Sequence, residues 1–222
     1  MNIPLSKRLE ACCRYVGQGD RVADIGCDHG YTGIYLLTQG IASAVFAADI
    51  HKMPLQSAIA NAEKFGVRNQ MQFFLSDGVQ NVPRDFDSLI CAGMGADTIV
   101  SILEAAPWLK QEQYRLILQC QSKTPMLRQY LSEHGWFIHR ENVLRDGRFL
   151  YTVMEVFYCP PAPRLTVGQY YFPPALFIEP SDILEEYYED VCIRLRRAIT
   201  GRGENAEVQM VQALQELEAR TW

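Results

Sequence analysis

A glycine-rich turn near the N-terminus carries two carboxylates. It reads Asp24-Ile-Gly26-Cys-Asp28-His29-Gly30 and follows a short apolar run. Because glycine has no Cβ, Gly26 and Gly30 allow the backbone to approach a ligand closely. A helix that begins directly after such a turn adds unpaired N–H groups and the positive end of its dipole. The turn is therefore a candidate ligand site.

The residues of this turn favour one type of nucleotide cofactor over another. Dinucleotide-binding folds use Gly-x-Gly-x-x-Gly here, so that a pyrophosphate rests on the helix N-terminus. In this chain the spacing is Gly-x-x-x-Gly, and Asp24 and Asp28 would repel a pyrophosphate. S-adenosylmethionine carries a sulfonium and an amino group, which suit two nearby carboxylates. The turn predicts S-adenosylmethionine as the cofactor and disfavours a dehydrogenase.

Two further acids follow later apolar runs. Asp49 ends the second run beside Ile50, where a carboxylate can accept both ribose hydroxyls. Asp77 follows the third run beside Gly78, where it can accept a hydrogen bond from an adenine amino group. A single aspartate at such a place is about as often a helix cap or a turn residue. Acids at three successive strand ends favour one shared ligand.

The fourth apolar run leads into Ala92-Gly93-Met94-Gly95-Ala96. Open α/β sheets bind ligands beyond the carboxyl ends of their strands, so this loop is expected to border the reaction site. Its two glycines leave room for a flat base, and Met94 is an adaptable apolar contact. The Asn-Pro-Pro-Tyr signature of amino-methyltransferases is missing, which argues against methylation of an exocyclic amine by that route. The simpler interpretation is an ordinary tight turn.

Alternating strands and helices are expected to position these residues. The predicted strands are 21–24, 44–49, 71–75, 86–92, 115–120, 136–144 and 149–158, and the predicted helices are 31–39, 54–66, 97–105 and 125–134. This order predicts a parallel sheet with helices on both faces. Asp146-Gly147 is a hairpin signal, so the last two strands should pair antiparallel. The expected fold is α/β and Rossmann-like, a class I methyltransferase sheet of seven strands with an antiparallel last strand.

The C-terminal part has a different pattern. Residues 161–180 are rich in proline and predict a linker without regular elements. Heptad-like apolar spacing over 184–198 and a second apolar stripe over 208–217 predict a coiled-coil-like helical hairpin at 181–222. The methyltransferase domain then occupies 1–160. The stripes pack together in the commoner interpretation, and a partner-binding face is the other.

Composition limits the class of protein. Of the 222 residues, 48% are apolar and 21% charged, which excludes wholesale disorder. No apolar run approaches the roughly 20 residues of a membrane span. The seven cysteines form no Cys-x-x-Cys, and the four histidines stand at no ligand spacing from them. We therefore expect mostly buried thiols, no metal site and a cytoplasmic protein.

The ordered set of motifs resembles the bacterial tRNA (adenine(22)-N1)-methyltransferase family, TrmK. The matching segments are 5–9, 24–31, 48–49, 54–55, 77–78, 92–95, 116–119 and 127–128, and the helical tail is similar to that family's coiled-coil extension. The resemblance implies transfer of a methyl group from S-adenosylmethionine to N1 of an adenine in the D-arm region of tRNA. Two departures from the family pattern, Ala96 and Gln119-Cys120-Gln121, lie near the expected substrate pocket and leave the cofactor residues intact.

The expected site residues fall into three groups. Cofactor binding is assigned to Asp24, Gly26, Gly30, Asp49, Ile50, Asp77, Gly78 and Gly93. Orientation of the target base is assigned to Asp28, His29 and Met94, because adenine N1 already has a free lone pair and needs placement more than a base. Contacts to tRNA, which are less expected at a net charge of −5, are assigned to Lys7, Arg8, Arg14, Arg194 and Arg197.

Two other functions stay open from the sequence. One is a methyltransferase that acts on another RNA or on a small molecule. The other is a non-catalytic RNA-binding module that retains the fold. His29 also has a second interpretation, in which it only orders the loop at the start of the helix. The oligomeric state is not predicted.

Overall fold

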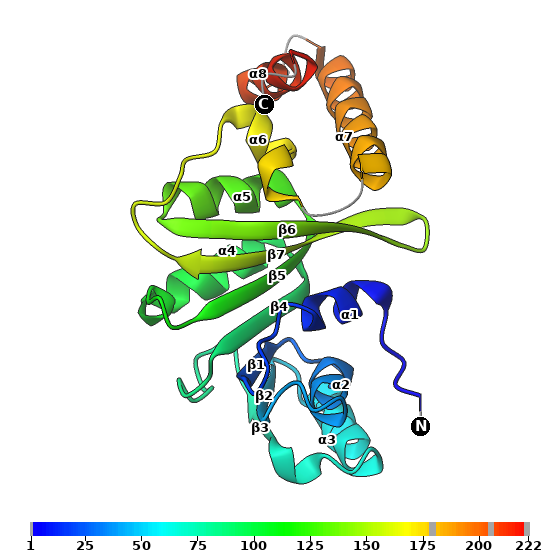
Figure 1. The fold of residues 1–222 in the computed structure, drawn as a ribbon, viewed down its shortest axis with the longest axis vertical. Coiled ribbons are helices and arrows are strands. Elements are labelled where there is room, and N and C mark those ends of the chain that lie inside the picture. The colour runs from blue at the N-terminus through cyan, green and yellow to red at the C-terminus, as the bar shows by residue number, and fades with distance from the viewer. Residues whose placement is uncertain (1, 178–180, 204–206, 220–222) are drawn as a thin grey trace.

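Seven strands form one mixed sheet in the order β3-β2-β1-β4-β5-β7-β6 (Figure 1). The computed structural model describes residues 2–177, 181–203 and 207–219. The strands are β1 (Arg21–Ile25), β2 (Ala44–Asp49), β3 (Met71–Leu75), β4 (Ser88–Gly95), β5 (Arg115–Ser122), β6 (Trp136–Asp146) and β7 (Phe149–Tyr158). The first five pair parallel, and β7 runs antiparallel to both β5 and β6. The predicted seven-stranded sheet with its antiparallel last strand is confirmed.

Helices cover both faces of the sheet (Figure 1). One face packs against α1 (Lys7–Cys13), α2 (Tyr31–Thr38) and α3 (Lys52–Lys64), and the other against α4 (Ala96–Ala105) and α5 (Thr124–Glu133). Single 3-10 turns lie at Arg68–Gln70, Pro107–Leu109 and Pro174–Leu176. Each face has its own apolar core because β1, β2 and β5 are buried on both sides, as strands of parallel sheets are. Six of the seven cysteines are buried in these cores or in that of the tail, and Cys159 is exposed.

The end of β4 differs from the sequence prediction. The strand continues through Gly93 to Gly95, where a tight turn was the simpler expectation, and its pairing with β5 shifts register around Met94. Gly93 has a φ of +79°, and its N–H donates to Oε1 of Gln119 at 3.0 Å. A glycine in the left-handed region and a side-chain acceptor thus support a β-bulge, which turns the strand end without breaking it.

The first helix closes onto strands that lie far away in sequence. The backbone N–H of Arg8 donates to Asp146, at the tip of the β6–β7 hairpin, over 3.5 Å. The hydroxyl of Tyr15, which follows α1, donates to Asn142 of β6. The helix ends at Cys13, so Arg14 caps it, and the Arg14 guanidinium lies 3.3 Å from Glu10.

The proline-rich segment 161–180 contains a regular element after all. Thr166 and Gln169 form a reciprocal capping box, and this starts the short helix α6 (Val167–Tyr171). The expectation of no regular element is therefore wrong over these residues. Residues 178–180, at the end of the predicted linker, lie outside the described part of the chain.

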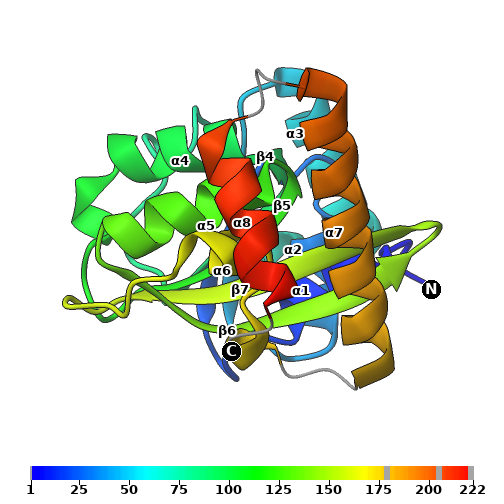
Figure 2. The same cartoon turned by 90° about the horizontal axis from the view of Figure 1, so that it is seen from above.

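The tail forms the expected pair of helices, α7 (Ser181–Arg202) and α8 (Val208–Glu218) (Figure 2). Their apolar stripes pack together with α6 and the β6–β7 hairpin in a third core. Its buried members are Val143, Phe172, Tyr187, Val191, Cys192, Leu195, Ala213 and Leu217. The commoner interpretation of the stripes is confirmed for these residues. The domain boundaries at 160 and 181 stay predictions.

A fully buried ion pair joins the tail to the sheet domain. Arg128 of α5 and Glu141 of β6 are both 0% exposed, with Nη2 of Arg128 2.6 Å from Oε1 and Nε 3.1 Å from Oε2 of Glu141. Nη1 of Arg128 donates to the carbonyls of Tyr170 and Tyr171 at 2.8 and 3.0 Å, and Nη2 to the hydroxyl of Tyr187 at 3.3 Å. Burial alone would lower the pKa of Arg128, but Glu141 and Tyr187 together outweigh it and raise the pKa. One guanidinium thus fixes α6 and α7 against the sheet.

We expect Arg128→Met to lower the free energy of unfolding by about 3–5 kcal/mol, because it leaves Glu141 buried without its partner. Arg194→Met is the matched control, since the Arg194–Asp190 pair is exposed; its loss should stay below about 1 kcal/mol. Urea denaturation measures both values. An equally small loss for Arg128→Met would contradict the anchoring role of the buried pair.

Candidate functional site

A cavity of about 200 Å³ lies at the carboxyl ends of β1 and β4. Its walls come from α1, from the glycine-rich turn with the start of α2, and from the end of β4. They are formed by Arg8, Leu9, Asp24, Gly26, Cys27, Asp28, His29, Tyr31, Thr32, Ala92 and Gly93. The structure therefore brings the predicted turn and the predicted loop together around one space. This is the edge at which open α/β sheets bind their ligands.

Asp24 supplies a buried carboxylate to this cavity. Its side chain is almost fully buried, and its Oδ2 has no hydrogen-bond partner. Burial raises the pKa of Asp24 to about 7, while a hydrogen bond from the backbone of Gly33 opposes the rise. Such a group is costly unless a ligand pairs with it. A cation or a hydrogen-bond donor in the cavity would satisfy it.

Asp49 organises the turn from the neighbouring strand. Its Oδ2 accepts the N–H of Asp28 at 3.1 Å, and its Oδ1 accepts the N–H of His51 at 2.9 Å. A carboxylate has about four lone-pair sites, so two sites remain for the hydroxyls of a ligand. Ile50, directly after it, is 56% exposed and offers an apolar surface at the same edge.

Asp77 and Gly78 lie one strand further along this edge. The N–H of Ser76 donates to the carbonyl of Asp49 at 2.9 Å, which brings the end of β3 next to the end of β2. Asp77 is exposed and does not line the cavity. Asp77, the third predicted acid, is therefore at the expected strand end. Along this edge the order is Asp24, Asp49 and then Asp77.

The glycine-rich turn has little free space over its backbone. Gly26 has a φ of +72°, and a Cβ there would overlap Cε of Met94. A Cβ on Gly30 would come within 2.9 Å of Cβ of Ala58. Asp28 adopts a positive φ of +49° without being glycine. The turn is held in a conformation that few residues tolerate, next to the cavity.

Of the three base-orienting candidates, Asp28 and His29 are exposed on the turn, and Nε2 of His29 lies 3.7 Å from Oδ1 of Asp28. The rings of His29 and Tyr31 have their centroids 5.9 Å apart. Met94 reaches the turn from the other strand through its contact with Gly26. Asp28 and His29 thus line the cavity, and Met94 lies beside it against the backbone of the turn.

The position of Arg8 differs from the surface position that the sequence analysis predicts for it. Instead of facing outward with Lys7, it is partly buried and lines the cavity. Its Nη1 donates to Oε1 of Gln119 at 3.1 Å, the same oxygen that accepts the N–H of Gly93. Gln119 is fully buried within β5. A glutamine within the apolar run Leu116-Ile-Leu-Gln119 is the sequence signal that could have indicated this network.

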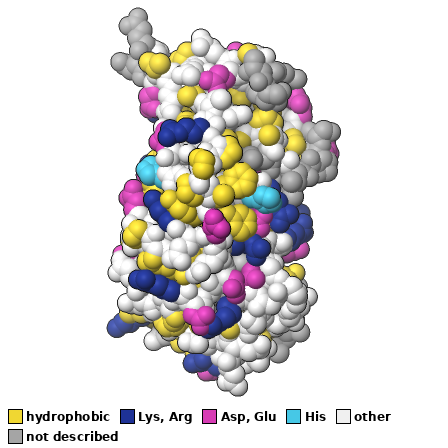
Figure 3. Space-filling view, turned by 60° about the vertical axis from the view of Figure 1, so that its left-hand side comes forward, with side chains coloured by type: hydrophobic (Ala, Val, Ile, Leu, Met, Phe, Trp, Pro, Cys, Tyr) yellow, Lys and Arg dark blue, Asp and Glu magenta, His cyan; other side chains and the backbone are white. Residues whose placement is uncertain are grey.

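The other basic candidates are exposed and lie on or next to two separate helices. Lys7 and Arg14 lie on or next to α1, and Arg194 and Arg197 lie on α7. Nη2 of Arg194 is 2.7 Å from Oδ2 of Asp190. On the face that Figure 3 shows, which includes the left-hand side of Figure 1, basic and acidic side chains are mixed. A phosphate backbone that approached this face would meet charges of both signs.

Two kinds of feature are missing from the residues that the structure describes. Within them, no group of three or more His, Cys, Asp or Glu side chains could hold a metal ion. No helix within 2–177, 181–203 and 207–219 has the length and apolar character needed to cross a membrane.

Comparison with known proteins identifies similar chains. Residues 5–154 match the family described as Methyltransferase domain. The tRNA (adenine(22)-N(1))-methyltransferase of Bacillus subtilis is 31% identical over 153 residues, which span 68% of this chain and 64% of that protein. The crystal structure of the B. subtilis m1A22 tRNA methyltransferase TrmK superposes with a TM-score of 0.78 at 26% identity, covering 99% of this chain and 96% of that one. These findings confirm the resemblance that the motifs predict.

A Streptococcus pneumoniae structure adds a ligand to the comparison. This candidate tRNA (m1A22) methyltransferase, in complex with S-adenosyl-L-methionine, has a TM-score of 0.83 and 29% identity and covers 96% of this chain and 99% of that one. The similarity thus extends over the tail as well as the sheet domain.

We expect Gly26→Ala to destabilise the protein more than Gly19→Ala. Both glycines have a positive φ, but no atom lies within 4 Å of a Cβ on Gly19. Each substitution should lose about 1–2 kcal/mol from the left-handed backbone, and Gly26→Ala about 1–3 kcal/mol more from the overlap with Met94. Denaturant unfolding measures the difference. Equal losses would show that Met94 does not pack against the turn, and Met94→Ala in the Gly26→Ala background should recover the extra loss.

Proposed function

The chain belongs to the methyltransferase-domain family, and on that premise we propose that it transfers a methyl group from S-adenosylmethionine to N1 of adenine 22 in tRNA. The observation that carries the proposal is the buried Asp24 carboxylate, whose Oδ2 has no hydrogen-bond partner, in a cavity at the carboxyl edge of the sheet. The similarity to tRNA methyltransferases over almost the whole chain supports the substrate. The proposal also makes the protein a cytoplasmic enzyme of tRNA modification.

The side chains around the cavity match the groups of the cofactor. Its methionine end carries an ammonium and a carboxylate, and Asp24 and Arg8 offer an anion and a cation within one cavity. Asp49 retains lone pairs for the ribose hydroxyls. Ile50 provides an apolar surface for the adenine ring, and Asp77 an acceptor for its amino group. Gly26 and Gly93 line the cavity, and Gly30 and Gly78 shape the backbone beside it by packing against Ala58 and Ile102.

This assignment moves Arg8 from the tRNA contacts to the cofactor site. Its guanidinium is held by Gln119 at 3.1 Å, so it is oriented before any ligand arrives. A planar fork fixed in this way pairs well with a carboxylate. Lys7 and Arg14, which are exposed, keep their proposed contacts to tRNA phosphates.

When bound, S-adenosylmethionine supplies an electrophilic methyl group on a positively charged sulfur. Because adenine N1 has a free lone pair at neutral pH, the task of this chain is to place N1 in line with that methyl group. Met94 and Gly93 border the space where the base would lie. Asp28 and His29 face it from the turn, and the Asp28 carboxylate can stabilise the positive charge that the methylated base acquires. Tyr31 can stack on a base that has left its helix.

Methyl incorporation tests the function directly. We expect the purified chain to transfer a labelled methyl group to tRNA, and a transcript with guanosine at position 22 to accept none. Asp49→Ala should weaken S-adenosylhomocysteine binding by about 2–3 kcal/mol, because it removes a charge-assisted acceptor. Calorimetry measures this affinity, and mass spectrometry identifies the base. Transfer to the position-22 variant, or to a small molecule alone, would contradict the proposed substrate.

The tail arginines are proposed to contact tRNA phosphates. Arg194→Gln and Arg197→Gln should each lower the slope of log affinity against log salt concentration by about 0.7–0.9. Point substitutions are the better test than truncation, because the tail shares a core with β6. Arg84→Gln is the control, since Arg84 comes just before β4. It therefore lies near the amino ends of the parallel strands, whereas the cavity lies at their carboxyl ends. Filter binding at several salt concentrations gives the slopes, and unchanged slopes for both tail variants would remove these residues from the interface.

A further inference from the structure

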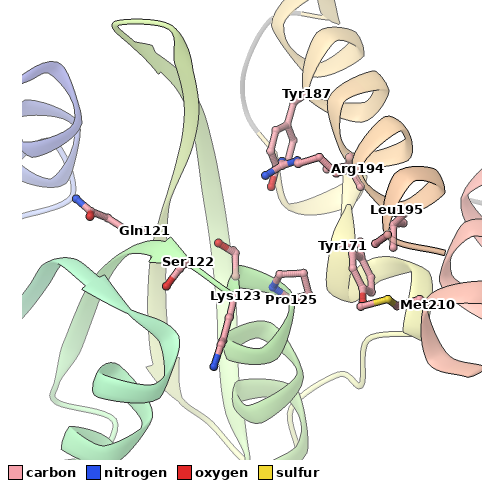
Figure 4. A pocket seen from close by; sticks show the side chains of 12 residues that line it. Gln121, Ser122, Lys123, Pro125, Tyr171, Tyr187, Arg194, Leu195 and Met210 are labelled. Carbon is pink, nitrogen blue, oxygen red and sulfur yellow. The ribbon is translucent and has the colours of Figure 1, made fainter. Parts of the chain in front are cut away.

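A second cavity, of about 240 Å³, lies between the end of β5 and the helical tail (Figure 4). Gln121 and Ser122 form its β5 side, and the first residues of α5 lie below them. Tyr171 of α6, Leu195 of α7 and Met210 of α8 face it from the tail. The cavity therefore exists only because α6, α7 and α8 pack beside the sheet domain.

The lining suits one flat aromatic ring. The tail side presents two tyrosines, Tyr171 and Tyr187, together with aliphatic side chains such as Val191 and Leu195. The volume is smaller than the 300–1,000 Å³ that is usual for a drug-sized ligand. Hydrogen-bonding groups lie on both sides of the cavity, from Ser122 and Thr124 around the end of β5 and from the Arg194 guanidinium on α7. Aromatic walls with a polar edge are what an unpaired nucleobase requires.

The cavity adjoins the proposed reaction site. Nε2 of Gln121 lies 3.6 Å from the place that a Cβ on Gly93 would occupy, and Oγ of Ser122 lies 3.0 Å from that of Gly95. Gly93 also lines the cavity around Asp24. The two cavities share no lining residue, so they are neighbours separated by the ends of β4 and β5. One RNA strand that crosses these strand ends can therefore reach both.

The rim carries cations that an RNA backbone can use. Arg194 and Lys123 both line the cavity, and their side chains are 61% exposed. Arg194 is paired with Asp190 at 2.7 Å and Lys123 with Asp97 at 2.8 Å. Exposed pairs of this kind contribute little, so a phosphate can compete for either cation. The charge at the rim thus fits a nucleotide better than a neutral ring compound.

We propose that this cavity binds an unpaired nucleobase of the substrate RNA that flanks the target adenine, while the target itself enters the space beside Met94 and Gly93. This inference rests on the proposed function and extends it, because it gives α6, α7 and α8 a direct part in selecting the RNA. The tail would then do more than attract phosphates. It would complete a base pocket that the sheet domain alone does not have.

Filling the cavity tests the proposal. Ala198 lines it, whereas Thr200 is an exposed residue of the same helix that does not. We expect Ala198→Trp to weaken tRNA binding by about 10-fold or more, the loss that follows when one base–aromatic stack is removed. Thr200→Trp should bind like the parent chain. Both variants should retain the parent's affinity for S-adenosylhomocysteine, which shows that the cofactor site is intact.

A substrate series identifies the base. Single abasic sites are placed at each nucleotide on either side of the target adenine, and one of them should weaken binding to the parent as much as Ala198→Trp does. The same abasic site should have no further effect in Ala198→Trp, because the two changes remove one interaction. Tyr171→Leu, which deletes a ring without filling the cavity, serves if Ala198→Trp does not fold, and should show the same pattern.

The outcomes separate this proposal from the function on which it rests. If the parent methylates tRNA and Ala198→Trp binds and methylates it equally well, no base occupies the cavity. Additive losses from the abasic site and the variant would likewise overturn it. If the parent methylates no tRNA, the proposed function fails first, and the base pocket fails with it.

Discussion

The buried pair of Arg128 and Glu141 is the interaction on which the arrangement of the molecule depends. Removing two charges from water is costly, and the cost is recovered only if every donor and acceptor finds a partner. Here the guanidinium bonds a carboxylate, two carbonyls of α6 and a hydroxyl of α7. These partners come from three elements, β6, α6 and α7, and Arg128 itself lies on α5, so four elements must assemble around one group. Together with the apolar core that the tail shares with β6, this group holds the tail against the sheet domain.

The opposite situation holds at the carboxyl edge of β1. Asp24 is also buried, but one of its oxygens has no partner in the protein. Asp28 adds a backbone conformation that is costly for any residue except glycine. Both features lower stability, and both face the same cavity. The unpaired oxygen of Asp24 and the strained backbone of Asp28 thus lie together where a ligand can compensate their cost. The buried charges of Arg128 and Glu141, by contrast, are fully paired within the protein.

Sequence patterns predict correctly those parts of the fold and the site that depend on residues close together in the chain. Strand positions follow from apolar runs, the antiparallel pair from Asp146-Gly147, and the acids at strand ends from the order of the elements. The parts that were missed depend on partners distant in sequence. Arg8 reads as a surface cation because nothing near it in sequence indicates Gln119. The bulge at Gly93 depends on that same amide, and α6 is a single capped turn that a proline-rich context conceals.

The long-range closure of α1 has a consequence for synthesis. The first helix leaves the ribosome early, but Arg8 and Tyr15 bond to Gln119, Asn142 and Asp146. Until those residues have emerged, one wall of the cavity around Asp24 cannot form, although the glycine-rich turn is already made. During synthesis, the buried face of α1 can pack only against the N-terminal elements until β5, β6 and β7 have emerged, and it stays partly exposed up to that point. The complete cavity is thus formed late in synthesis, after the N-terminal helix has bonded to β5 and to the β6–β7 hairpin.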